Sequence, residues 1–81
     1  MDDTVINPDA VLDTSGMLCP IPVIKTSKSI KQIEVGQVLK MISTDPGAVP
    51  DMAAWSRQTG HEMLESHQED DIYIFFFCRT R

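Results

Sequence analysis

The residue type best suited to chemistry is a cysteine, Cys19, which stands directly before a proline in the stretch Cys19-Pro20-Ile21-Pro22. Proline fits the first turn of a helix, because its fixed φ suits the helix and its missing N–H would be unpaired there. The pattern predicts that Pro20 is the first helical residue, that Cys19 is the N-cap, and that the Ile21 amide donates to the sulfur. Gly16 supplies the turn before it. A helix N-terminus favours a thiolate, so we expect the pKa of Cys19 to lie below the usual ~8.5.

The histidines and the second cysteine are the other candidates for chemistry. Hydrolysis by a cysteine needs an adjacent base. His61 is expected at the opposite end of the sheet, and His67 lies roughly 14 Å away, across three strand spacings. Two lone histidines predict exposed polar residues and no metal site. Cys78 is expected about 20 Å from Cys19, too far for a disulfide. A carrier with no metal and no cofactor is favoured over a hydrolase.

The elements that position these residues follow from periodicity and turn signals. Strand-helix-strand units cross over right-handedly, so the first three strands should run parallel and the last should return antiparallel. The predicted fold class is α+β, a two-layer β-α-β-α-β-β sandwich with a four-stranded mixed sheet and both helices on one face. The expected elements are strands at 10–13, 38–43, 62–66 and 72–79, and helices at 20–33 and from Pro50 to Gly60.

A turn at Asp45-Pro46-Gly47 ends the second strand, on the same edge as Cys19. Aspartate accepts backbone donors, proline fixes φ, and Gly47 is expected to take a positive φ. Two interpretations stay open. The turn is chosen for its backbone angles alone, or it also borders the Cys19 loop and shapes a docking surface.

Lys25, Lys28 and Lys31 recur every third residue along the first helix. They are either a solvated helix face or a docking stripe for an acidic partner surface. Trp55 and the Phe75-Phe76-Phe77 run are expected in the core, although alternation along a strand must place at least one phenylalanine on the sheet face without helices.

Composition narrows the class of protein further. With 81 residues the chain is one small domain, in which we expect a loose tail at 1–9 and the folded domain at 10–81. A net charge of −5 argues against a nucleic-acid partner. The longest apolar run, Ile72 to Cys78, is too short to span a membrane, and the N-terminus lacks signal-peptide features. A cytoplasmic, reducing location is expected.

The motif Cys19-Pro20-Ile21-Pro22 resembles the C-P-x-P signature of the TusA-like (SirA-type) sulfur-carrier proteins. The resemblance covers nearly the whole chain after the tail, and continues through Asp13-Thr14-Ser15-Gly16, Thr44-Asp45-Pro46-Gly47, Asp51 to Trp55, and Gly60-His61-Glu62. It implies a sheet order of 1-2-4-3. It also implies two kinds of partner: a sulfur donor, either a cysteine desulfurase or a rhodanese-like protein, and a sulfur-acceptor protein serving tRNA thiolation or sulfur oxidation.

The resulting hypothesis is a sulfur carrier rather than a turnover enzyme. Cys19 would take a sulfane sulfur as a persulfide and pass it on, which requires an exposed, reactive thiol on a rigid corner. Two alternatives stay open: a non-catalytic interaction or regulatory module of the same fold, and a peroxide-sensing thiol.

Overall fold

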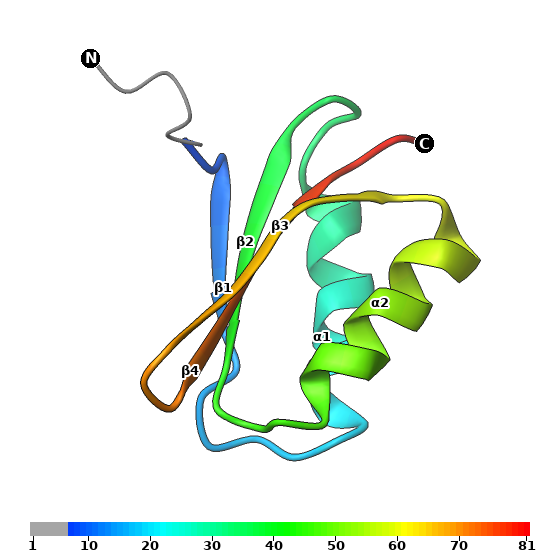
Figure 1. Ribbon diagram of the computed structural model, residues 1–81. Coiled ribbons are helices and arrows are strands. Elements are labelled where there is room, and N and C mark those ends of the chain that lie inside the picture. Colours follow the sequence, from blue (N-terminus) through cyan, green and yellow to red (C-terminus); the bar gives the residue numbers. More distant parts are fainter. Residues whose placement is uncertain (1–6) are drawn as a thin grey trace.

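The computed structural model describes residues 7–81, which form two layers, with both helices packed on one face of a single sheet (Figure 1). The elements in chain order are β1 (Ala10–Asp13), α1 (Ile21–Ser29), the 3₁₀ turn η1 (Ile30–Gln32), β2 (Val38–Ser43), α2 (Ala48–Thr59), β3 (Glu62–Glu69) and β4 (Ile72–Cys78). The two-layer β-α-β-α-β-β prediction is confirmed.

The sheet has the order β1-β2-β4-β3. β1 runs parallel to β2 with Leu12 opposite Met41, and β4 runs antiparallel to both of its neighbours. The three strands β1, β2 and β3 therefore point the same way. Their carboxyl ends meet at one edge, where the loops that lead into α1 and α2 also lie (Figure 1).

Both helices begin at positions other than those predicted. α1 begins at Ile21, one residue after Pro20, and α2 begins at Ala48, two residues before Pro50. Pro50 is tolerated as the third residue of α2, because the first-turn amides have no intrahelical partner to lose. The predicted end of α2 is confirmed: Gly60 takes a left-handed conformation (φ 85°) and caps the helix.

β3 is longer than predicted and continues to Glu69 instead of ending at Ser66. Its polar residues stay in the sheet because Gln68 and Glu69 pair with Tyr73 and Ile72 of β4. Only a two-residue turn joins the strands, and Asp70 adopts a positive φ of 55° there, as tight hairpins require. β4 ends at Cys78, one residue earlier than expected.

The three consecutive phenylalanines divide between the two faces of β4. Phe75 and Phe77 are fully buried under the helices, and Phe77 meets the Trp55 ring edge-on at a centroid distance of 5.0 Å. Phe76 lies on the other face, as alternation requires. It is nevertheless buried, because the Lys40 ammonium lies 5.9 Å from its centroid and the His67 ring 6.4 Å from it.

The predicted tail at 1–9 falls mostly outside the described residues, which begin at Asn7. Its last residue is tied to the sheet. The Asp9 amide donates to the Val38 carbonyl at 2.8 Å, and the Asp9 carboxylate accepts from the Val38 amide at 2.8 Å. Strand pairing thus begins one residue before β1. Within residues 7–81 no helix is both long and apolar enough to cross a membrane.

Candidate functional site

Cys19 lies in the loop between β1 and α1, beside the loop between β2 and α2, and its side chain is exposed. Two carboxylates from the second loop and from α2 reach it. The Cys19 amide donates to Asp45 Oδ2 at 3.1 Å, and the thiol donates to Asp51 Oδ2 at 2.7 Å. The thiol is therefore accessible to solvent, although its hydrogen is donated to Asp51.

Hydrogen bonds hold the Cys19 loop to the end of β2 and to the residue after it. Thr14 is fully buried, and both its amide and its hydroxyl donate to the Ile42 carbonyl, at 2.8 and 2.6 Å. The Gly16 amide donates to Thr44 Oγ1 at 2.9 Å, with Gly16 at a φ of 80° that suits glycine. The sulfur consequently sits on a fixed corner.

The predicted N-cap is wrong by one residue. Pro20 occupies the cap position, so Cys19 lies just outside α1, and the Cys19–Pro20 peptide bond is cis. The Ile21 amide donates to the Leu18 carbonyl at 3.0 Å and not to the sulfur. Pro22 is buried in the first turn of α1, which anchors the helix start against the rest of the domain.

The electrostatics of the thiol also differ from the prediction. The pKa of Cys19 is raised, not lowered, chiefly because the thiol donates a hydrogen bond to Asp51. Desolvation and the negative charges of Asp51 and Asp45 act in the same direction. Two nearby carboxylates disfavour a thiolate, and Cys19 lacks the N-cap position that would have favoured one.

The Asp45-Pro46-Gly47 turn borders the Cys19 loop, as one of the two open interpretations held, and Asp45 joins the two loops directly. Its Oδ1 accepts from the Gly47 amide at 3.0 Å while its Oδ2 accepts from the Cys19 amide. The expected positive φ at Gly47 is wrong: Gly47 has a φ of −64° and serves as the N-cap of α2. Asp45 itself, through both carboxylate oxygens, fixes the turn.

Two features of this edge of the molecule do not follow from the sequence: the contact of Asp51 with the thiol and an exposed apolar rim. Asp51 lies in the first turn of α2, and its proximity to Cys19 follows from the tertiary fold. The rim consists of Leu18 and Ile21, which flank the Cys19-Pro20 pair, and Val49 in the first turn of α2. Their exposed fractions are 69%, 46% and 41%. Exposed apolar side chains beside a reactive group suit contact with another protein.

The three lysines do not all lie near the sulfur. Lys25 and Lys28 are exposed on α1, but Lys31 falls in η1, roughly 17 Å along the helix axis from Pro20. There it lines a cavity with residues from the far end of α2. If the lysines dock a partner at Cys19, Lys25 is therefore expected to contribute most, because it is the lysine of α1 nearest to Cys19 in the sequence.

The remaining titratable candidates lie away from the thiol. Cys78 pairs with Val38 at the opposite end of β2, and neither cysteine forms a disulfide. His67 is exposed, within 3.6 Å of carboxylates on its own strand. His61 contradicts the prediction of an exposed histidine, because only 8% of it is exposed. Among residues 7–81 no three histidine, cysteine or acidic side chains gather closely enough to hold a metal ion.

Known proteins resemble this chain over most of its length. The family model described as "Sulfurtransferase TusA" matches residues 10–79. The sulfur carrier protein TusA of Allochromatium vinosum is 43% identical over 72 residues, which cover 89% of this chain and 95% of that protein. The crystal structure of the SirA-like protein from Desulfitobacterium hafniense matches with a TM-score of 0.77 at 20% identity. That match covers 89% of this chain and 99% of the SirA-like chain, and it shows a shared fold.

Proposed function

The chain belongs to the TusA family of sulfurtransferases, and from this premise we propose that Cys19 carries sulfur as a persulfide from a donor protein to an acceptor protein. Homology to a named sulfur carrier supports the carrier role. The assignment to Cys19 rests on one observation: its sulfur is exposed on a loop that hydrogen bonds hold to the neighbouring loop. The residues proposed to shape this site are Gly16, Pro20, Ile21, Pro22, Asp45, Pro46 and Gly47.

Each transfer is a thiol–persulfide exchange. The Cys19 thiolate attacks the terminal sulfur of the donor's persulfide, and a new S–S bond forms at Cys19 Sγ. The donor's S–S bond breaks, and its electron pair leaves on the donor's cysteine sulfur, which takes up the proton that Cys19 released. The second transfer is the same reaction with Cys19 as the leaving thiolate. No oxidant or reductant is consumed in either step.

Asp51 keeps the resting carrier in its protonated, less reactive form, because it accepts the thiol hydrogen and opposes the thiolate charge. Sulfur transfer then needs a partner that shifts the equilibrium of Cys19 from the thiol toward the thiolate. A basic group on the docked donor, placed beside Asp51, would lower the pKa of Cys19. Reactivity would be switched on by docking, and an idle carrier would resist stray electrophiles.

The partner surface is proposed to combine the apolar rim of Leu18, Ile21 and Val49 with the lysines of α1. Partners of the expected chemistry are a cysteine desulfurase or rhodanese-like donor and an acceptor protein in tRNA thiolation or sulfur oxidation. A reducing compartment such as the cytoplasm fits a carrier that must keep Cys19 as a thiol. A peroxide sensor is less well supported, because peroxide oxidation favours a cysteine with a low pKa.

The test is the intact mass of the protein after incubation with a cysteine desulfurase and cysteine. We expect one added sulfur atom on the wild type and on Cys78→Ser, and none on Cys19→Ser. Loading that survives Cys19→Ser, or that disappears in Cys78→Ser, would refute the assignment. Function retained in Cys19→Ser without loading would point instead to an interaction module.

A further inference from the structure

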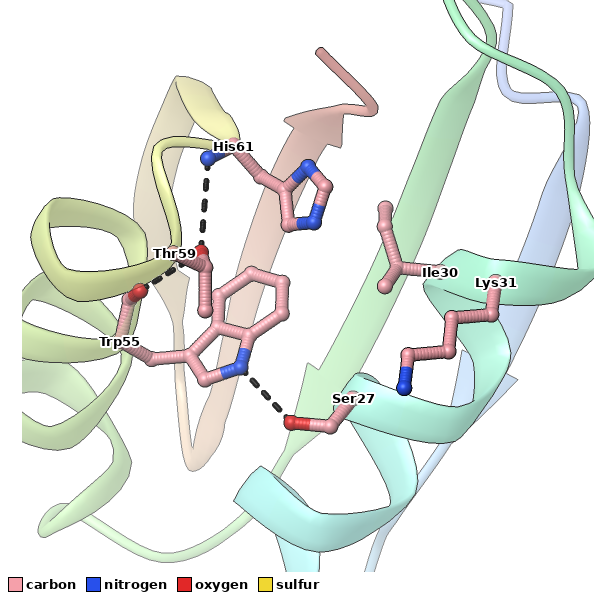
Figure 2. Close-up of a pocket in the computed structure, with 6 residues that line it drawn as sticks. All are labelled: Ser27, Ile30, Lys31, Trp55, Thr59 and His61. Carbon is pink, nitrogen blue, oxygen red and sulfur yellow. Dashed lines mark hydrogen bonds between the residues drawn. The ribbon is translucent and has the colours of Figure 1, made fainter. Parts of the chain in front are cut away.

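A small cavity opens between the two helices, away from the Cys19 loop (Figure 2). Its volume is about 180 Å³, and it is lined by Ser27, Ile30, Lys31, Trp55, Thr59 and His61. Drug-sized ligands need roughly 300–1,000 Å³. A cavity of about 150 Å³ is enough for benzene. The volume therefore suits a single ring with a small substituent.

One wall of the cavity is flat and apolar. The Trp55 indole N–H donates to Ser27 Oγ at 2.8 Å, and Phe77 packs edge-on against the ring, so the indole is held in one orientation. Ile30 faces it from η1 (Figure 2). Aromatic ligands pack well against such a surface, by stacking and by burial of apolar area.

His61 supplies a hydrogen-bond donor at the same cavity. Its Nδ1 accepts the Thr80 amide at 3.2 Å, so in the neutral ring Nε2 carries the proton. Burial, with the charges of Arg79 and Arg81, lowers the pKa of His61, which favours this neutral form. Figure 2 shows one ring nitrogen turned toward the space beside Ile30. Nε2 has no hydrogen-bond partner among residues 7–81.

The surroundings of the cavity are positively charged, in a chain whose net charge is −5. Lys31 lines the cavity with its ammonium directed toward Ser27 (Figure 2). The Arg79 guanidinium donates to the carbonyls of Lys31 and Ile33, at 3.3 and 2.6 Å. Within the described part of the chain no aspartate or glutamate side chain forms an ion pair with Lys31, Arg79 or Arg81. An anionic ligand would compensate this local excess of positive charge.

We propose that the cavity is a binding site for a small aromatic carboxylate. The ring packs between Trp55 and Ile30, and the carboxylate accepts from His61 Nε2–H and pairs with the Lys31 ammonium. The size of the cavity and its flat wall select the ring, and the His61 and Lys31 donors that line the cavity select the carboxylate. The site is separate from the thiol, so the proposal stands independently of sulfur transfer.

The test is a titration of the intact protein with benzoate at constant ionic strength. Trp55 is the single tryptophan of the chain, so its fluorescence reports on this cavity alone. We expect a saturable change in fluorescence, together with shifts of the His61 ring signals in NMR spectra. Benzamide, which keeps the ring but lacks the charge, should bind at least about fivefold more weakly, since it loses the charge-assisted contacts. Acetate, which lacks the ring, should not saturate.

The matched variants are Lys31→Met and Lys28→Met. Both remove one exposed lysine charge from neighbouring turns, and only Lys31 lines the cavity. Lys31→Met should weaken benzoate binding at least about fivefold, while Lys28→Met should stay within about twofold of the wild type. Any of three results would overturn the proposal. They are equal losses of benzoate affinity in the two variants, a fluorescence change that does not saturate, and NMR shifts centred on the Cys19 loop.

Discussion

The carboxylates of Asp51 and Asp45 have two functions around the thiol: Asp51 holds the Cys19 thiol in its protonated form, and Asp45 joins the two loops. Replacing each with asparagine should separate these functions. Asp51→Asn removes the negative charge from a side chain whose oxygen lies 2.7 Å from Sγ, and leaves one neutral amide oxygen as a weaker acceptor of the thiol hydrogen. The pKa of Cys19 should therefore fall, because the hydrogen bond that contributes most to its elevation is weakened and the charge of Asp51 is lost. Asp45→Asn removes a smaller contribution to the same pKa, so its effect there should be smaller.

The reactivity of the thiol should follow its pKa with a reduced slope. While the pKa stays above the assay pH, each unit removed raises the thiolate fraction about tenfold, but a less basic thiolate is a weaker nucleophile, with a Brønsted coefficient of about 0.4–0.5. The net gain is about three- to fourfold in rate per unit. Thiolate absorbance against pH gives the pKa, and alkylation by iodoacetamide gives the rate. Both are measured in Cys78→Ser, which leaves one thiol.

The free energy of unfolding should respond in the opposite order, with a larger loss in Asp45→Asn than in Asp51→Asn. Asparagine has one acceptor oxygen, so Asp45→Asn cannot serve the Cys19 and Gly47 amides as the carboxylate does. Because water reaches this turn, the loss should be about 1 kcal/mol, equivalent to roughly 4–8 °C in Tm for a domain of this size. Asp51→Asn should cost at most the helix-dipole contribution of about 0.3–1 kcal/mol.

Any of three results would contradict this reasoning. An unchanged or higher pKa in Asp51→Asn would show that the carboxylate does not hold the thiol in its protonated form. An Asp45→Asn protein that melts with the wild type would show that this side chain does not join the two loops. Alkylation that accelerates equally in both variants would mean that charge alone matters and that the thiol hydrogen bond adds nothing.

Three further outcomes are expected. Replacing Lys25 and Lys28 with glutamate should slow protein-to-protein sulfur transfer and flatten its salt dependence, while alkylation of the thiol changes by less than about twofold. The lowered pKa of His61 contributes stability above its ordinary value of 6.5 that is lost as pH falls, so urea unfolding of His61→Gln should depend less on pH between about 7.5 and 5 than that of the wild type. Phe77→Ala should cost about 3–5 kcal/mol, and Phe76→Ala, on the face without helices, clearly less, both measured by urea unfolding.

The sequence was informative wherever local pattern decides structure. The alternation in 38–43 predicted both bounds of β2, and the glycine after the second helix predicted its end at Gly60. The sheet order was implied by the family resemblance, since periodicity cannot tell which strands are neighbours. Both kinds of inference placed the Cys19 and Asp45 loops on one edge, and the hydrogen bond between the Cys19 amide and Asp45 confirms that the two loops are neighbours.

Two of the errors have the same cause, which is contact between residues distant in sequence. The thiol of Cys19 meets Asp51, 32 positions later, and that contact reverses the expected direction of its pKa shift. His61 is buried because the Trp55 ring lies 5.5 Å away and the Thr80 amide satisfies one of its nitrogens. Neither partner can be found from the spacing of residues along one helix or strand.

The sheet order has a consequence for self-association. β1 and β3 form the two outer strands, whose free backbone groups could pair with another chain. β1 is only four residues long, and the eight residues of β3 include three glutamates. Short strands and repeated like charges both discourage edge-to-edge pairing. Replacing those glutamates with neutral residues would remove the repulsion along β3, so we expect such a variant to self-associate through the β3 edge.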